Sequence, residues 1–352
     1  VCTFLSGGLD SSLISSVASR YFAKQGKKLS TFSVGYKDNE KYFKKSKFQP
    51  NSDPAYIRIM ADYLGSDHHD VILDTPELVR GLYDAVDARD LPGMADVDSS
   101  LLLFCREIKK TGTVALSGEC ADEIFGGYPW YRDPQIRSRY GFPWAQTTDY
   151  RMGFLRDEWA RKIDGHAYVD ARYRATLAQT DRQPGLSETE NRMKEMMNLN
   201  VHWFMQTLLD RKDRMSMATG LEVRVPFCDY RIAEYLYTVP WEFKDYNHTE
   251  KGLLREAMKD YLPDEVLWRK KSPYPKTHHP AYRAAVEREM RETILSDPNA
   301  PILQLVKRDA LTHLLEESNP TPWYGQLMNT PQTIAYLLQV NYWLQKYRVD
   351  IR

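Results

Sequence analysis

Two short glycine-containing segments hold the residues of this sequence best suited to chemistry. The first is S-G-G-L-D-S-S at residues 6–12, between an apolar run at 1–5 and a helical pattern. A strand that turns through Gly7 and Gly8 into a helix exposes backbone N–H groups and a positive dipole end, which favours phosphate binding. Asp10 adds a carboxylate suited to Mg²⁺. A plain connecting turn would explain two adjacent glycines, but not the whole segment.

The second segment is S-G-E-C-A-D-E-I-F-G-G-Y at residues 117–128, which follows another apolar run. Three carboxylates, those of Glu119, Asp122 and Glu123, fall within five positions. Asp122 could join Asp10 in holding Mg²⁺ on a leaving pyrophosphate, and Glu119 could face an acyl site. The alternative is an acidic first turn that offsets a helix dipole. That alternative leaves the strand end and the paired glycines unexplained.

A scaffold must bring these segments together, and the spacing of apolar residues indicates which one. Runs rich in β-formers alternate with helical patterns and lie at residues 1–5, 29–34, 68–73 and 113–116. This alternation predicts an α/β fold with a parallel, doubly wound sheet. Ligands of such sheets bind at the carboxyl ends of the strands. We therefore expect Ser6, Val34 and Ser117 on one rim.

The pattern changes along the chain. We expect an α/β core over 1–130 and a mainly helical region over 131–352, where strand signals nearly vanish. Residues 36–53 are polar and lysine-rich and predict a long loop. The first helix should bury one apolar face, made of Leu13, Ile14, Val17, Ala18, Tyr21 and Phe22.

Bulk composition excludes several classes of function. The 352 residues contain 42% hydrophobic residues, and their 48 Lys+Arg balance 48 Asp+Glu. This neutrality argues against a nucleic-acid partner, and no apolar run approaches the ~18 residues of a membrane span. The four cysteines are scattered, as in a reduced, cytoplasmic enzyme. Because Val1 already lies in a strand pattern, we expect that residues precede it in the natural protein.

The two segments together resemble the synthetase half of glutamine-dependent asparagine synthetases of the B type, within the N-type ATP pyrophosphatase (PP-loop) family. Residues 213–229 are similar to the D-R-x-S-M…E-x-R-x-P-F-x-D stretch of those enzymes, and residues 268–275 to their W-R-x-K stretch. The resemblance implies a PP-loop sheet that amidates aspartate to asparagine. It also implies a β-aspartyl-AMP intermediate and the release of AMP and pyrophosphate. ATP, Mg²⁺, aspartate and ammonia are the implied ligands.

The resemblance also implies roles for individual residues. Glu119 would lie at the aspartate and ammonia site, Lys271 would neutralise phosphates during adenylation, and Arg211 would bind the substrate carboxylate. Asp10 and Asp122 would bind the metal. The ATP and pyrophosphate site would comprise Leu5, Ser6, Gly7, Gly8, Asp10, Ser11, Val34, Ser117 and Gly118.

Other residues near these stretches leave alternatives open. Lys251 and Arg255 lie one turn apart and could reach phosphate, or equally lie on a helix surface. We expect Arg224 and Asp229, which flank Val-Pro-Phe, to form a buried ion pair or a loop anchor. Cys120 stands where the family often has a small residue, which leaves the identity of the substrate open.

The resemblance implies an N-terminal glutaminase domain, absent from these residues, that supplies ammonia; a homodimer is compatible with it. One rival hypothesis is a PP-loop amidotransferase or cyclase acting on another carboxyl group, such as a cell-wall peptide or a β-lactam precursor. Another is adenylation of tRNA bases, against which the neutral charge argues. A nucleotide sensor without catalysis is a third, and it would form no AMP.

Overall fold

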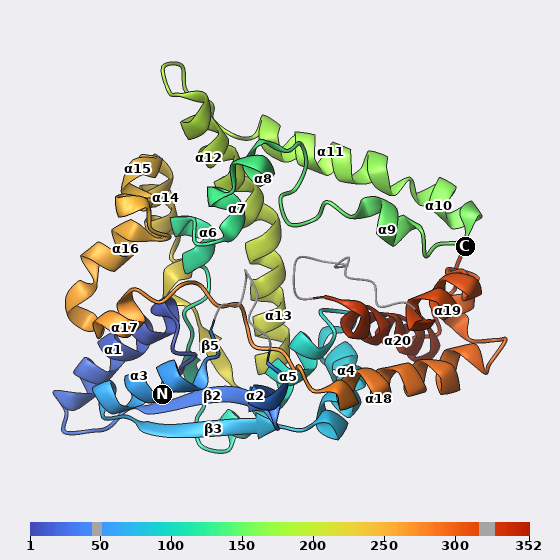
Figure 1. Ribbon diagram of the computed structural model, residues 1–352, viewed down its shortest axis with the longest axis horizontal. Coiled ribbons are helices and arrows are strands. Elements are labelled where there is room, and N and C mark those ends of the chain that lie inside the picture. Colours follow the sequence, from blue (N-terminus) through green and yellow to red (C-terminus); the bar gives the residue numbers. More distant parts are fainter. Residues whose placement is uncertain (44–50, 317–327) are drawn as a thin grey trace.

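The computed structural model describes residues 1–43, 51–316 and 328–352 and contains a parallel five-stranded sheet in the order β3-β2-β1-β4-β5 (Figure 1). The strands are β1 (Cys2–Phe4), β2 (Ser30–Tyr36), β3 (Asp67–Leu73), β4 (Val114–Leu116) and β5 (Glu222–Arg224). The expected parallel α/β fold is confirmed. The strand order reverses between β1 and β4, which is where open α/β sheets bind their ligands.

The fifth strand comes from the region expected to be helical. β5 pairs in parallel with β4, with Val114 opposite Glu222 and Leu116 opposite Arg224. Three residues are too few to produce an alternating pattern that could be recognised in the sequence. Residues beyond 131 therefore contribute to the sheet itself.

Helices cover both faces of the sheet and extend well beyond it. Those of the α/β part are α1 (Leu9–Ala23), α2 (Asn39–Tyr42), α3 (Pro54–Leu64), α4 (Thr75–Arg89), α5 (Asp96–Lys109) and α6 (Ala121–Phe125). They are followed by α7 (Pro129–Arg132), α8 (Pro134–Ser138), α9 (Thr148–Met152), α10 (Asp157–Ile163), α11 (Gly165–Ala178), α12 (Glu188–Leu199), α13 (Gln206–Met217), α14 (Tyr230–Thr238), α15 (Trp241–Lys244), α16 (Gly252–Ala257), α17 (Asp264–Leu267), α18 (Pro280–Met290), α19 (Arg308–Glu316) and α20 (Thr330–Lys346). Of the loop expected over 36–53, residues 44–50 lie outside the described part.

The two faces of the sheet differ in chemistry. Cys2 and Phe4 are buried in an apolar cluster with residues of α4, α5 and α13. Thr3, next to them, is directed to α1, where its Oγ1 lies 2.7 Å from Ser15 Oγ. This alternation is the two-residue period of a strand.

The buried side of α1 is not the one that the apolar spacing predicted. Leu13 and Ala18 are buried, but Val17 is 48% exposed and Tyr21 is 63% exposed. Serines face inward instead, and Ser16 Oγ donates a hydrogen bond of 2.7 Å to the Tyr261 carbonyl. The apolar pattern failed here because hydrogen-bonded hydroxyls can occupy a buried helix face at little cost.

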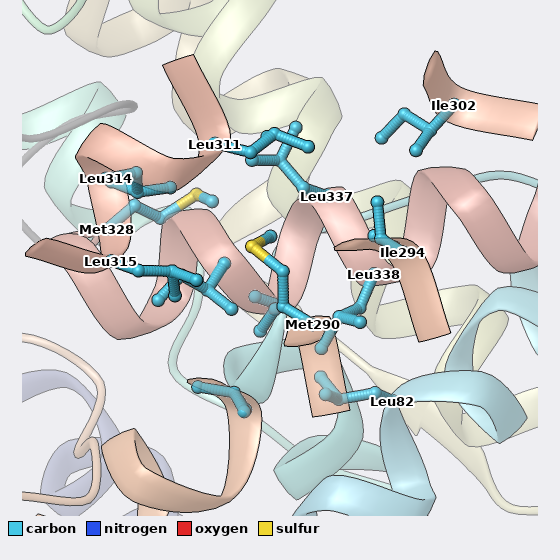
Figure 2. Packing of buried hydrophobic residues seen from close by; sticks show 14 of the residues in the cluster. Leu82, Met290, Ile294, Ile302, Leu311, Leu314, Leu315, Met328, Leu337 and Leu338 are labelled. Carbon is cyan, nitrogen blue, oxygen red and sulfur yellow. The ribbon is translucent and has the colours of Figure 1, made fainter. Parts of the chain in front are cut away.

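Two groups of helices outside the α/β part stand out. One long helical run, α12 and α13 joined through the π-helical residues Asn200–Met205, passes upright through the molecule from the layer of α9–α11 to the sheet (Figure 1). Figure 2 shows the second group, where Met290 of α18 and Leu337 and Leu338 of α20 pack over Leu82 of α4. No helix in the described ranges is long and apolar enough to cross a membrane.

Candidate active site

A cavity of about 690 Å³ lies where the carboxyl ends of β1, β2 and β4 meet. Its lining includes nearly every residue that the sequence predicted for a site. These are Leu5, Ser6, Gly8, Asp10, Ser11, Val34, Ser117, Gly118, Glu119, Asp122, Arg211 and Lys271. The convergence expected from strand ends is therefore present in the fold.

Gly7 is the predicted residue that does not line the cavity. Its φ is +67°, and a Cβ at this position would lie 2.7 Å from the backbone nitrogen of Ile57. Gly7 thus lets the turn after β1 pack against the start of α3. Gly118 has a similar role, because a Cβ there would lie 2.6 Å from the backbone of Asp10 and Ser11. The two glycine segments can touch each other only because Gly118 has no side chain.

The first loop is held together by its own hydroxyl groups. Ser6 Oγ and Ser11 Oγ lie 2.8 Å apart, and the Ser6 N–H donates to Ser11 Oγ at 3.1 Å. The Gly8 N–H points to Ser6 Oγ at 3.3 Å. Arg269 donates to the Ser6 carbonyl at 3.2 Å and also pairs with Asp53. The start of α1 is thereby fixed with its N–H groups at the cavity.

A buried lysine joins the two glycine segments. Lys251 is 2% exposed, and its Nζ lies 2.7 Å from Asp10 Oδ2 and 2.7 Å from Asp122 Oδ1. Burial opposes its charge, but the two carboxylates outweigh this and raise the pKa of Lys251. The alternative that Lys251 lies on a helix surface is wrong.

Lys271 completes this charged cluster, as the sequence predicted. Its Nζ lies 2.6 Å from Asp122 Oδ2. Burial would raise the pKa of Asp122, but Lys251 and Lys271 outweigh it and hold that pKa well below its ordinary value. Burial dominates at Asp10 and raises its pKa, although Lys251 opposes the shift. This end of the cavity, where the two glycine segments meet, therefore holds two carboxylates and two ammonium groups.

Arg255, four residues after Lys251, positions the chain around the lysines. It is 1% exposed, and its Nη2 donates to Glu250 Oε1 and to the Arg269 carbonyl, both at 3.1 Å. Glu250 in turn accepts the Lys271 N–H. Arg255 thus anchors residues 268–271 rather than covering a helix surface.

Glu119 forms a second charged group beside the first. One carboxylate oxygen, Oε1, lies 3.3 Å from Arg211 Nη2 and 3.2 Å from Lys212 Nζ. The other oxygen, Oε2, is buried and has no hydrogen-bond partner among the described residues. Sequence reasoning predicted Glu119 and Arg211 but missed Lys212. The adjacent basic pair in α13 was the available signal.

Glu123, the third carboxylate of the motif, has a different environment. It is 1% exposed, and Tyr128 donates a hydrogen bond of 2.6 Å to its Oε1. Burial, with the nearby negative charge of Asp122, raises the pKa of Glu123 to about 7. Glu123 thus lines the same cavity as Asp122, as a buried carboxyl group bonded to Tyr128.

The expected ion pair between Arg224 and Asp229 does not form. The Arg224 side chain is 62% exposed and pairs with Glu222 at 2.7 Å. Asp229 instead accepts the Arg231 N–H at 2.9 Å and caps α14. The loop-anchor role is thus confirmed for Asp229, whereas strand pairing directs Arg224 to solvent.

Comparison with known proteins agrees with this geometry. The family model for asparagine synthase matches residues 1–345. The chain belongs to the asparagine synthase family. It is 51% identical over 355 residues to asparagine synthetase [glutamine-hydrolyzing] 3 of Bacillus subtilis, covering 100% of this chain and 57% of that protein. The match to asparagine synthetase [glutamine-hydrolyzing] 1 of the same organism is 29% over 346 residues, covering 89% and 50%.

A more distant relative is asparagine synthetase [glutamine-hydrolyzing] of Mesocricetus auratus, 28% identical over 283 residues, with 78% of this chain and 39% of that protein covered. The chain thus spans about half the length of the curated relatives it matches. Members of the asparagine synthase family therefore share with this chain the part that holds both glycine segments and both lysines.

The carboxylates of Asp10 and Asp122 fit a divalent cation that also binds a nucleotide. Asp10 and Asp122 converge on one cationic position, which the Lys251 ammonium holds. Mg²⁺ typically binds one or two carboxylates together with substrate phosphates. Both lysines would then be available for phosphate oxygens. The described part of the chain has no group of three or more His, Cys, Asp or Glu side chains placed to hold a metal ion together.

Proposed function

We propose that this chain catalyses ATP-dependent amidation of aspartate to asparagine, with release of AMP and pyrophosphate. The observation that supports this most strongly is the division of one cavity into two charged ends. Asp10, Asp122, Lys251 and Lys271 form the first end, and Glu119 with its two cationic partners forms the second. A reaction that joins a nucleotide to a carboxylic acid needs both of these charged ends.

The first step is adenylation. The β-carboxylate of aspartate attacks the α-phosphorus of ATP, so two anions must approach each other. Lys251 and Lys271 can leave their carboxylate partners and bind phosphate oxygens, which offsets this repulsion and stabilises the leaving pyrophosphate. Mg²⁺, when bound by Asp10 and Asp122, supplies further positive charge to the same phosphates.

The second step is capture of the acyl-adenylate by ammonia. Attack forms a C–N bond, breaks the C–O bond to AMP and leaves a proton to be removed. Glu119 is the group placed for this, because its Oε2 is buried and has no hydrogen-bond partner in the described part of the chain. Arg211 and Lys212 hold Oε1 and fix the direction of the carboxylate.

We further propose that glutamine is the natural source of ammonia, through a glutaminase domain beyond these residues. The support is that the relatives named above are glutamine-hydrolysing and are longer than this chain. We place the reaction in the cytoplasm, where the four free thiols stay reduced.

The test is to supply the purified protein with ATP, Mg²⁺, ammonium and one carboxylic acid at a time. We expect asparagine and AMP in equal amounts with aspartate, and none from an Asp122→Ala variant. Glu107→Ala, at an exposed residue paired with Lys110, is the matched control and should stay active. AMP formation with another acid but not with aspartate would support the second candidate, amidation or cyclisation of a different carboxyl group.

A further inference from the structure

The segment after Lys271 crosses the same cavity and brings one more cation to it. Residues 273–276 and 278 all line the cavity together with Glu119. Within this segment, Tyr274 lies under Arg211, whose guanidinium carbon is 5.4 Å from the ring centroid. Lys276, two residues further on, lines the same cavity as Glu119 and Arg211.

Three hydrogen bonds hold the backbone on both sides of Lys276. Tyr36 donates to the Pro275 carbonyl at 2.8 Å, and Asn39 Nδ2 donates to the Lys276 carbonyl at 3.2 Å. The His278 N–H donates to Asn39 Oδ1 at 2.6 Å. Tyr36 is the last residue of β2 and Asn39 follows it closely, so the sheet itself fixes where the Lys276 side chain starts.

The charge of Lys276 has no direct partner among the described residues. Every other buried cation of the described lining forms an ion pair, and these pairs are Arg211–Glu119, Lys212–Glu119, Lys251–Asp122, Lys271–Asp122, Arg255–Glu250 and Arg269–Asp53. No carboxylate of the described residues lies within 4.0 Å of Lys276. Burial lowers its pKa, and Asp96 opposes this from a distance. A partly buried ammonium without a counter-ion is unfavourable and suits an anionic ligand.

We propose that Lys276 binds the α-carboxylate of the amino-acid substrate and so determines specificity for aspartate. This rests on the proposed function and deepens it. Arg211 was expected to bind the substrate carboxylate, but Glu119 holds its Nη2 and Met94 sulfur its Nη1, and the guanidinium lies over the Tyr274 ring. Only its Nε lacks a hydrogen-bond partner among the described residues. Lys276 takes that role, and Arg211 orients Glu119. The β-carboxylate is then left for adenylation at the other end of the cavity.

The experiment compares aspartate with β-alanine, which keeps the reacting carboxylate and the amine but lacks the α-carboxylate. Aspartate-dependent and β-alanine-dependent AMP formation are measured in the full-length protein with ammonium, for wild type, Lys276→Met and Lys276→Arg. We expect Lys276→Met to lower kcat/KM for aspartate by about 10- to 100-fold, the range of one charge-assisted hydrogen bond. Its kcat/KM for β-alanine and its KM for ATP should stay unchanged, and Lys276→Arg should recover part of the loss.

Lys37→Met is the matched control, because Lys37 is exposed on the neighbouring segment and does not line the cavity. Equal losses with aspartate and β-alanine in Lys276→Met would show a folding or general electrostatic role and would overturn the proposal. So would an unchanged preference for aspartate. If wild-type protein used neither aspartate nor β-alanine but another acid, the proposed function itself would fail, and this inference with it.

Discussion

The Lys251 ammonium lies 2.7 Å from the Asp122 carboxylate, although 129 residues separate the two in sequence. Lys251 precedes α16 in a left-handed conformation, with φ of 55°, and Asp122 lies in the first turn of α6. Their contact joins the mainly helical region to the sheet at the phosphate end of the cavity. An ammonium in this place can exchange a carboxylate for a phosphate when a nucleotide binds.

Replacing Lys251 by Met should destabilise the protein. Two buried carboxylates would lose their shared cation, and breaking a buried ion pair typically costs about 3–5 kcal/mol. Urea unfolding without nucleotide measures this loss. The control is Lys270→Met, at the exposed residue that precedes Lys271. Equal stability of Lys251→Met and wild type would contradict a structural role for this cluster.

Replacing Glu119 by Gln should separate the two half-reactions. The variant keeps the size of the side chain but cannot take a proton, so asparagine formation should fall by about 10²- to 10³-fold. Aspartate-dependent exchange of pyrophosphate into ATP, which reports adenylation alone, should largely remain. Glu107→Gln serves as the control. Loss of exchange along with synthesis would show instead that Glu119 is needed before ammonia attacks.

Replacing Gly7 by Ala should disturb the first loop through its contact with α3. Both Gly7 and Gly26 have positive φ, +67° and +69°, but only at Gly7 would a Cβ meet backbone atoms at 2.7 Å. We expect Gly7→Ala to lose about 2 kcal/mol or more of unfolding free energy beyond the loss in Gly26→Ala. Similar losses in the two variants would mean that φ strain alone matters.

Glu123 should make stability depend on pH. Its folded pKa of about 7 lies above the ordinary value of 4.5, so the folded state holds the proton more tightly than the unfolded chain. Its stabilising contribution is complete below pH 4.5 and is lost as pH rises to about 7, a change on the order of 3 kcal/mol.

Glu123→Gln removes this titration while keeping an oxygen for Tyr128. Unfolding free energies at pH 5 and pH 8 should therefore show the variant gaining on wild type as pH rises. Glu107→Gln, at an exposed carboxylate, should follow wild type at both pH values. A constant difference between Glu123→Gln and wild type would show that Glu123 is ionised throughout this range.

Local sequence patterns were sufficient to predict much of the site. The loop at 6–12 and the motif at 117–128 each follow a strand, and parallel strands place their carboxyl ends together. Glu119 and Asp122 accordingly lie at the cavity, as does Lys271, whose place there was implied only by the family resemblance. Lys251 could not be assigned in this way, because its partners lie 241 and 129 residues away and nothing in its neighbours indicates burial.

Two structural features were missed for different physical reasons. β5 is too short for its period to be detected, and its pairing with β4 depends on the sheet already being formed. The buried face of α1 uses Ser15 and Ser16, whose hydroxyls are satisfied by Thr3 and the Tyr261 carbonyl. Hydrophobic spacing therefore indicated Val17 and Tyr21 instead. Such polar, long-range contacts leave no periodic signal.

The most direct test of the proposed chemistry follows an oxygen atom. Aspartate labelled with ¹⁸O in its β-carboxylate is incubated with the protein, ATP, Mg²⁺ and ammonium, and the nucleotide and phosphate products are analysed by mass spectrometry. Attack of this carboxylate on the α-phosphorus of ATP predicts that one labelled oxygen is transferred to AMP. Label in inorganic phosphate, with ADP as the nucleotide product, would show attack on the γ-phosphorus and would contradict the account.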